Sequence, residues 1–200
     1  MKIGVLDIQG SVEEHILMLK KCGIEPVSVK TSEDLKGLKG LIIPGGESTT
    51  IGKLLKRFGL FDEIIERAGK GMAIWGTCAG AILLAKNVVG EEGKIAVESL
   101  GLMNICIERN AYGRQVDSFE TEIEFCFFGK NRGAKTRKIP AVFIRAPKIV
   151  SVGSGAKVLA RDGAEVVAVL QGKFLATTFH PEMTDDLSVH QFFGAICGGI

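Results

Sequence analysis

The sequence lacks three features, and each absence excludes a class of protein. Charge of one sign is not in excess: the formal net charge is +2 over 200 residues, with acidic and basic residues interspersed, so the concentrated basic surface that binds nucleic acid is missing. No apolar run approaches the about 20 residues that a membrane-spanning helix needs. No small-residue cleavage site follows the short apolar run at the N-terminus. We therefore expect a protein that binds neither nucleic acid nor a membrane.

Paired cysteines are also missing. The five cysteines are odd in number, widely spaced and free of any C-x-x-C pair: Cys22, Cys78, Cys106, Cys126 and Cys197. This pattern argues against a disulfide framework and against a zinc site. Because free thiols fit a reducing compartment, we expect a cytoplasmic protein without a metal centre.

What is present indicates one α/β domain over residues 1–200. A hydrophobic content of 46% is enough for a sizeable core, and no stretch is typical of a linker. In the first half, strands at 2–7, 26–30, 40–43 and 72–75 alternate with helices at about 11–22 and 49–57. Strands such as 41–43 are apolar throughout, as expected when helices cover both faces of a parallel sheet. The pattern predicts a doubly wound, mostly parallel sheet.

The second half has a different pattern. From about residue 95 strand-like runs follow one another with few helical stretches between them, at 105–109, 119–125, 141–144, 157–160, 164–170 and 174–178. We expect an antiparallel or mixed extension of the sheet. A last helix at about 185–197 is expected to pack its apolar side chains on the core, namely Leu187, Phe192, Phe193 and Ile196.

The run from Ile74 to Leu84 places Cys78 between two glycines, where a buried strand gives way to an apolar helix. This is the cysteine version of the nucleophile elbow. Unpaired N–H groups at a helix N-terminus favour a thiolate, and the Ala79 N–H is placed to stabilise an oxyanion. The alternative is that Cys78 is one more small buried residue, which is our interpretation of the other four cysteines.

A cysteine nucleophile needs an imidazole base, and the chain has three histidines. His15 and His190 fall inside predicted helices, and we give them structural roles. His180 follows a strand, where active-site loops of open sheets gather, so it is the candidate base. Residues two apart on an extended chain point the same way, so Glu182 is expected to bond the far nitrogen of His180 and orient it. The alternative is an ordinary turn with a solvated glutamate.

A Pro-Gly-Gly turn ends the strand at 40–43 and is followed by Glu47 and Ser48. Such a turn lets backbone N–H groups face a ligand, so Gly46 is the candidate for a second oxyanion donor. The alternative, which is compatible with the first, is a plain helix N-cap by Ser48 or Thr49. The spacing of a phosphate-binding P-loop is absent.

Residues 44–48, 76–80 and 180–182, in this order, resemble the class I (triad) glutamine amidotransferases. More narrowly, further runs resemble the glutaminase subunits of pyridoxal 5'-phosphate synthase: residues 4–6, 9–10, 45–50, 108–110, 113–120 and 143–147. The resemblance covers nearly the whole chain. It implies glutamine hydrolysis through a thioester on Cys78, without a cofactor, and delivery of ammonia to a synthase subunit.

The same resemblance implies that glutamine is bound by Gly46, Glu47, Ser48, Arg109, Ile144 and Arg145. A guanidinium at Arg109 can pair with the substrate's α-carboxylate through two bonds. For Arg145 a surface salt bridge is the alternative. One stretch departs from the family pattern: residues 126–140 are longer and more basic, and we expect a solvated loop there, with contact to an acidic partner surface as the alternative.

Three other functions remain open at this point. The first is a glutaminase of the same fold that serves another synthase, such as one in histidine or purine biosynthesis, although residues 109–110 and 113–120 favour the vitamin B6 branch. The second is a redox sensor with an elbow cysteine, against which His180 and Glu182 argue, because a sensor needs no general acid. The third is hydrolysis of γ-glutamyl peptides without a partner.

Overall fold

The computed structural model describes residues 1–90, 98–109, 118–129 and 133–199. Five parallel strands form its centre, in the order β2-β1-β3-β4-β12. Their bounds are β1 (Lys2–Leu6), β2 (Glu25–Val29), β3 (Gly40–Ile43), β4 (Ala73–Thr77) and β12 (Phe174–Thr177). The order reverses at β1, which is the switch point of a doubly wound sheet.

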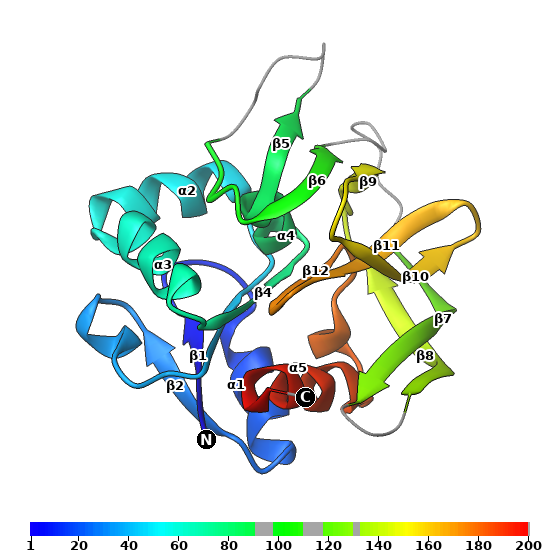
Figure 1. Cartoon of the computed structure of the whole chain (residues 1–200), viewed down its shortest axis with the longest axis horizontal. Helices are drawn as coiled ribbons and strands as arrows, with labels where there is room; N and C mark the ends of the chain where they lie inside the picture. Colours follow the sequence, from blue (N-terminus) through cyan, green and yellow to red (C-terminus); the bar gives the residue numbers. More distant parts are fainter. Residues whose placement is uncertain (91–97, 110–117, 130–132, 200) are drawn as a thin grey trace.

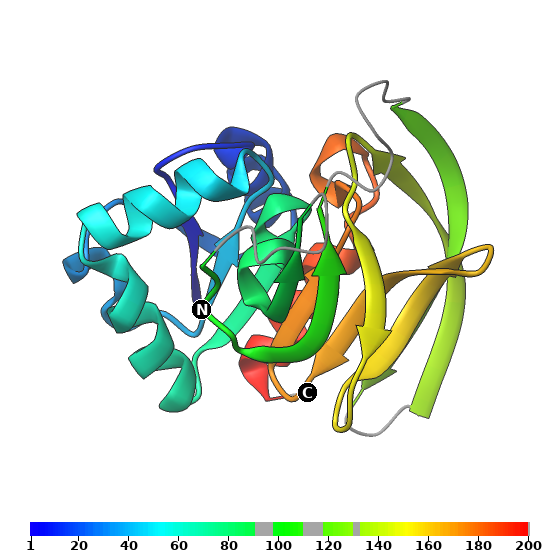
Figure 2. The ribbon, with the colours of Figure 1, turned by 90° about the horizontal axis from the view of Figure 1, so that it is seen from above.

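The sheet continues beyond β12 as antiparallel strands in the order β11-β10-β7-β8. These are β7 (Phe119–Gly129), β8 (Gly133–Phe143), β10 (Lys157–Asp162) and β11 (Glu165–Gln171). A branch adds β5 (Ala85–Val89), β6 (Met103–Glu108) and β9 (Lys148–Val152), with β9 pairing with β11. Figure 2 shows β7, β8, β10 and β11 at the end of the molecule opposite the helices α2 and α3. The predicted doubly wound sheet with an antiparallel extension is confirmed.

Helices cover both faces of the parallel strands (Figure 1). The amphipathic helices α2 (Ser48–Arg57) and α3 (Leu60–Gly69) and the short α4 (Ala79–Leu84) pack on one face, and α1 (Val12–Lys21) and α5 (Ser188–Gly198) pack on the other. Side chains alternate between these two cores along each strand: Leu41 and Ile43 join the α2–α4 side, whereas Ile42 joins the α1–α5 side with Trp75.

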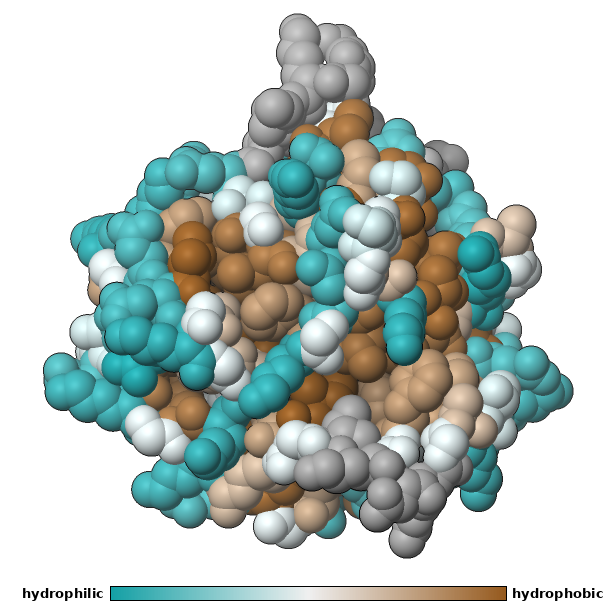
Figure 3. Space-filling view, in the orientation of Figure 1, coloured by the Kyte–Doolittle hydropathy of each residue, from teal (hydrophilic) through white to brown (hydrophobic). Residues whose placement is uncertain are grey.

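Hydrophilic residues lie around much of the rim and also cross the middle of the molecule in the view of Figure 3, with hydrophobic residues between them. The hydrophilic residues are thus dispersed on this face rather than gathered into one patch.

The solvated loop expected over residues 126–140 is wrong. The described part of this stretch belongs to β7 and β8, which pair in continuous register from Phe119 opposite Phe143 to Gly129 opposite Gly133. Its basic side chains are exposed on β8, at the edge of the sheet, and Arg137 pairs with Asp186 at 2.7 Å. An exposed edge strand does not need alternating apolar and polar residues. The charged residues of this strand therefore gave no pattern that indicates a strand in the sequence.

Candidate active site

Three neighbouring parallel strands end at one edge of the sheet, and the predicted catalytic residues and the Pro-Gly-Gly turn follow them. The order β3-β4-β12 brings the Pro-Gly-Gly turn, Cys78 and His180 together, because the carboxyl ends of parallel strands share an edge. Cys78 directly follows β4, and His180 lies three residues after the end of β12.

Cys78 occupies a strained turn between β4 and α4. Its backbone has φ 48° and ψ −103°, a left-handed conformation that is rare for a residue with a side chain. Its N–H donates to the Thr177 carbonyl at 2.8 Å, which ties the turn to β12. Gly76 and Gly80 permit this geometry, because a Cβ on Gly76 would collide with the Gly80 backbone and one on Gly80 with the Ile43 carbonyl. The predicted elbow geometry is therefore present.

His180 connects Cys78 to Glu182. The imidazole interacts electrostatically with the Cys78 thiol, and its Nδ1 lies 2.7 Å from Oε1 of Glu182. A Cβ on Gly45 would collide with the imidazole ring, so only glycine lets the loop after β3 approach His180 this closely. The expected contact is present, but the expected reason for it is wrong. Residues Pro181–Met183 form a short 3-10 helix rather than an extended segment, and this turn brings the Glu182 carboxylate to Nδ1 of the ring.

Both members of this pair have shifted pKa values. Burial alone would lower the pKa of His180, but its hydrogen bonds to Cys78 and Glu182 outweigh burial and raise the pKa to about 10. Burial would raise the pKa of Glu182, but His15 and His180 beside the carboxylate outweigh it and lower the pKa to about 2. The geometry therefore favours an imidazolium held by a carboxylate.

A pocket of about 370 Å³ opens over Cys78 and His180. Its lining includes every predicted site residue except Glu182, which lies behind His180: Gly46, Glu47, Ser48, Cys78, Ala79, Arg109, Ile144, Arg145 and His180. The elements that supply this lining are far apart in the sequence, and the fold brings them around one cavity of a size that suits a small substrate.

Glu47 is the N-cap of α2, and this corrects the alternative that Ser48 or Thr49 caps the helix. Its carboxylate accepts hydrogen bonds from the N–H groups of Thr49 at 3.1 Å and Thr50 at 2.7 Å. Burial opposes ionisation of Glu47, but the bonds from Thr49 and Thr50 outweigh it and lower its pKa to about 2. Arg109 lies 3.2 Å from this carboxylate, so the guanidinium is anchored at the pocket wall.

Ile144 and Arg145 follow β8 and form the opposite wall. The Cys78 thiol lies 3.8 Å from the Ile144 carbonyl, in the geometry of a weak S–H hydrogen bond. Arg145 has φ 45°, a strained conformation of the kind that clusters at functional sites. Over the residues that the structure describes, no acidic side chain forms an ion pair with Arg145, so the alternative of a surface salt bridge has no partner there.

The loop after β3 is held by the turn that follows β1. The side-chain oxygen of Gln9 accepts from the Glu47 N–H at 2.8 Å, and the Ser11 N–H donates to the Gly45 carbonyl at 3.2 Å. Gly46 lies between these two contacts. Ala79 is the first residue of α4, so its N–H is one of the four that a helix leaves without an internal partner.

His15 and His190, for which the sequence indicated structural roles, form a buried pair beside Glu182. His15 Nε2 lies 3.5 Å from Oε2 of Glu182, and His15 Nδ1 lies 2.9 Å from His190 Nε2. The sequence held a partial signal, because both fall on the core-facing side of amphipathic helices where a histidine needs a polar partner. Their common partner could not be found without the fold.

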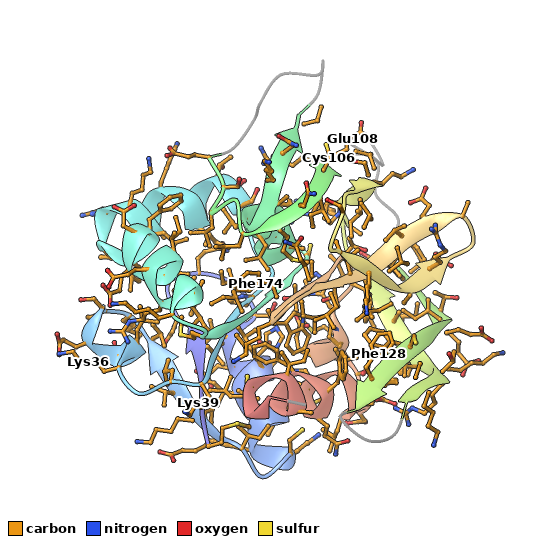
Figure 4. The ribbon with its side chains drawn as sticks, viewed as in Figure 1. Lys36, Lys39, Cys106, Glu108, Phe128 and Phe174 are labelled. Carbon is orange, nitrogen blue, oxygen red and sulfur yellow. The ribbon has the colours of Figure 1, made fainter. Side chains whose placement is uncertain are left out.

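The other cysteines lack such surroundings. Cys106 lies on β6 beside Glu108 (Figure 4), and burial, together with that negative charge, raises the pKa of its thiol. Burial also raises the pKa of Cys22, and raises that of Cys197 to about 12. Cys197 is buried as expected, whereas Cys22, Cys106 and Cys126 are half-buried. A thiol with a raised pKa is a poor nucleophile at neutral pH.

Among the described residues no group of three or more His, Cys, Asp or Glu side chains is placed to hold a metal ion. None of the described helices combines the length and the apolar character needed to cross a membrane. The motif residues Asn110 and 113–117 lie outside the described residues.

Known proteins resemble this chain over nearly its whole length. The model of the SNO glutamine amidotransferase family matches residues 5–197. A curated relative from Chloroflexus aurantiacus, pyridoxal 5'-phosphate synthase subunit PdxT, is 50% identical over 96% of this chain and 98% of its own. The protein of the same name from Caldicellulosiruptor saccharolyticus is 52% identical over 96% of each chain. A solved glutamine amidotransferase structure superposes with a TM-score of 0.86 at 47% identity, covering 98% of each chain.

Proposed function

Because the chain belongs to the SNO glutamine amidotransferase family, we propose that it hydrolyses glutamine and supplies the ammonia for pyridoxal 5'-phosphate synthesis. It is the glutaminase subunit of a pyridoxal 5'-phosphate synthase. One observation supports the assignment of its catalytic residues: Cys78, His180 and Glu182 interact in series at a pocket on the edge of the sheet. We assign these three residues as nucleophile, general acid and base, and orienting carboxylate.

The first half of the reaction forms a thioester. The Cys78 thiolate attacks the side-chain carbonyl carbon of glutamine, and the electron pair of the C=O bond moves to oxygen. The N–H groups of Ala79 and Gly46 are assigned to stabilise this oxyanion. When the tetrahedral intermediate collapses, the C–N bond breaks and the His180 imidazolium gives its proton to the leaving nitrogen, which departs as ammonia.

The second half returns the enzyme to its starting state. Neutral His180 removes a proton from a water molecule, whose oxygen attacks the thioester carbon. The C–S bond then breaks, glutamate leaves, and the Cys78 thiolate is regenerated beside the His180 imidazolium. Glu182 stabilises the imidazolium in both halves through the 2.7 Å contact at Nδ1.

Substrate binding is assigned to Gly46, Glu47, Ser48, Arg109, Ile144 and Arg145, which all line the pocket. The side chain of Glu47 already caps α2 and pairs with Arg109, so we assign its backbone and the Arg109 guanidinium to the substrate. A guanidinium suits the α-carboxylate of glutamine because it offers parallel donors.

The expected partner is the synthase subunit that accepts the ammonia, as the names of the relatives indicate for those proteins. We assign the chain to the cytoplasm, which its five free cysteines support. We also treat residues 1–200 as one glutaminase domain, because a single sheet connects the parallel and antiparallel halves. Relatives at about 50% identity favour the vitamin B6 branch over a glutaminase for another synthase.

Ammonia release from glutamine by the chain together with its synthase subunit tests the assignment. Cys78→Ala should abolish release and leave the thermal unfolding temperature close to that of wild type, whereas Cys106→Ala, the matched control, should keep most of the activity. A glutamine analogue that alkylates thiols should label Cys78 alone. Ammonia release by Cys78→Ala at the wild-type rate, or labelling at Cys106 instead, would contradict the assignment.

A further inference from the structure

Two further histidines lie beyond Glu182 in the same buried region. His15 on α1 and His190 on α5 are both 0% exposed. His15 Nε2 lies 3.5 Å from Oε2 of Glu182, and His15 Nδ1 lies 2.9 Å from His190 Nε2. All three histidines of the sequence therefore lie in one buried series with Glu182, although they come from three separate segments of the chain.

The second oxygen of Glu182 needs a donor. Oε1 receives the hydrogen of His180 Nδ1, whereas Oε2 is buried and, within the described part of the chain, has no hydrogen bond that meets ordinary distance and angle limits. A buried ionised oxygen without a partner is costly. His15 Nε2 faces this oxygen at 3.5 Å, which is the outer limit of a hydrogen bond.

Only one tautomer of His15 serves Glu182. Burial lowers the pKa of His15 and lowers that of His190 well below its ordinary value, so both rings are neutral and each carries one N–H. With the hydrogen on Nε2, His15 faces Glu182 and the Thr77 hydroxyl, 3.3 Å away, as a donor. With the hydrogen on Nδ1, a lone pair would face the carboxylate.

His190 selects the useful tautomer. One hydrogen lies between His15 Nδ1 and His190 Nε2, and if His190 supplies it, His15 must carry its own hydrogen on Nε2. The Nδ1 atom of His190 then has no hydrogen, which agrees with its being buried without a partner among the described residues, because an orphaned N–H is rarer than an orphaned acceptor. Trp75 packs edge-on against both rings, with centroids 5.4 Å from His15 and 4.8 Å from His190, and restricts their rotation.

We propose that His15 is a positioning residue for the hydrolysis, holding the second oxygen of Glu182 through its Nε2–H, and that His190 acts through His15 by fixing this tautomer. The inference rests on the proposed function, in which Glu182 orients His180. It extends the set of residues that govern the reaction onto α1 and α5, the two helices on the face opposite α2–α4.

A defined change in pH dependence follows. The groups that face Glu182 are His180 and His15, and beyond them lie Cys78, His190 and Glu14. Loss of the His15 donor removes the N–H that faces the ionised form of Glu182, so the pKa of Glu182 rises. A less ionised Glu182 holds the imidazolium less well, so the pKa of His180 falls. The active form has Glu182 ionised and His180 protonated. Its pH range then becomes narrower, because the acidic limit rises and the alkaline limit falls.

The test compares His15→Leu with His15→Gln, in the complex with the synthase subunit. Leucine fills the site without a donor, whereas the glutamine amide places a donor near the position of Nε2. His15→Leu should lower kcat about 10- to 100-fold, with little change in KM, as is typical when a group that orients a catalytic side chain is lost, and its pH profile should narrow. His15→Gln should recover most of the kcat and most of the width of the pH profile. Leu19→Ala, one turn further along α1 and also buried, is the control: it should lower the unfolding temperature and leave the width of the pH profile unchanged.

The role of His190 is tested by a double-mutant cycle. His190→Leu should lower kcat in the wild-type background and have no further effect in His15→Leu, because it acts only through His15. Equal effects in both backgrounds, or a His15→Leu profile as wide as that of wild type, would overturn the proposal.

Nitrogen-15 NMR of histidine-labelled wild-type chain keeps the proposal falsifiable if these variants do not fold. It should show neutral Nε2–H tautomers for His15 and His190, and a charged His15 or an Nδ1–H tautomer at His15 would refute the inference. This readout needs no activity. Absence of ammonia release by the wild-type complex would instead refute the proposed function.

Discussion

His180 Nδ1 lies 2.7 Å from Oε1 of Glu182, and the Glu182 side chain is fully buried. The buried carboxylate holds the imidazole in a single orientation, with its other nitrogen toward Cys78. Water could not impose this orientation. The stability and the activity of the protein should therefore both depend on this pair.

Replacement of the two residues should affect turnover unequally. His180→Asn should lower kcat by at least about 10⁴-fold, because it removes the group that moves protons, and the loss in Glu182→Gln should be about 10- to 100-fold smaller, as for the orienting residue of other triads. Steady-state ammonia release by the two variants, each with the synthase subunit, measures the order. Equal losses, or a greater loss in Glu182→Gln, would show that the roles are assigned wrongly.

The same pair predicts how stability depends on pH. The pKa of His180 is raised to about 10, so its contribution is fully present below its unfolded value of about 6.5 and is lost as the pH rises toward 10. The pKa of Glu182 is lowered to about 2, so its contribution is present above about 4.3 and is lost as the pH falls toward 2. Denaturant unfolding across this range should give a free energy of unfolding that declines at both ends.

Glu182→Gln is the comparison for this experiment, because it removes the carboxylate and keeps the size of the side chain. The decline at both ends should be smaller in this variant. Equal pH dependence in the two proteins would show that the His180–Glu182 pair is not its source.

Activity should also depend on the partner. The Glu47 N–H is tied to Gln9 and the Gly45 carbonyl to the Ser11 N–H, so the loop that carries Gly46 is held by the turn before α1. We expect a synthase subunit that packs on this turn and on α1 to reorient the loop and complete the oxyanion site. The isolated chain should then be slower by about 10²–10³-fold in kcat, the cost of one missing oxyanion donor.

Ammonia release at matched glutamine concentrations, with the synthase subunit and with an equal mass of serum albumin as control, measures this coupling. A chain that is fully active alone, and unaffected by the partner, would indicate a stand-alone γ-glutamyl hydrolase instead.

The sequence was sufficient where local rules decide the structure. The elbow at Cys78 is fixed by Gly76, Gly80 and a fully apolar strand, and all of these can be identified without coordinates. The helix α3 was missed although its buried residues are spaced by three and four. Gly59, with φ 67°, turns the chain between α2 and α3. The hydrophobic pattern of the sequence did not separate these two short helices, so only the first was predicted.

Contacts made by tertiary structure could not be predicted in this way. His15, Glu182 and His190 meet because α1 and α5 lie on the same face of the sheet, and no spacing in the sequence encodes that meeting. The end of β8 was predicted as the strand at 141–144, but its first part was missed for a related reason, because that part is an exposed edge whose pairing with β7 sets its conformation.

The fate of the glutamine amide nitrogen tests the central claim most directly. The chain and its synthase subunit are incubated with the synthase's sugar-phosphate substrates and glutamine labelled with nitrogen-15 at the side-chain amide, and the mass of the pyridoxal 5'-phosphate formed is measured. Wild-type chain should yield labelled product, and Cys78→Ala should yield it only when labelled ammonium is supplied. Unlabelled product from the wild-type chain, or labelled product from Cys78→Ala with glutamine as the sole nitrogen source, would contradict the account.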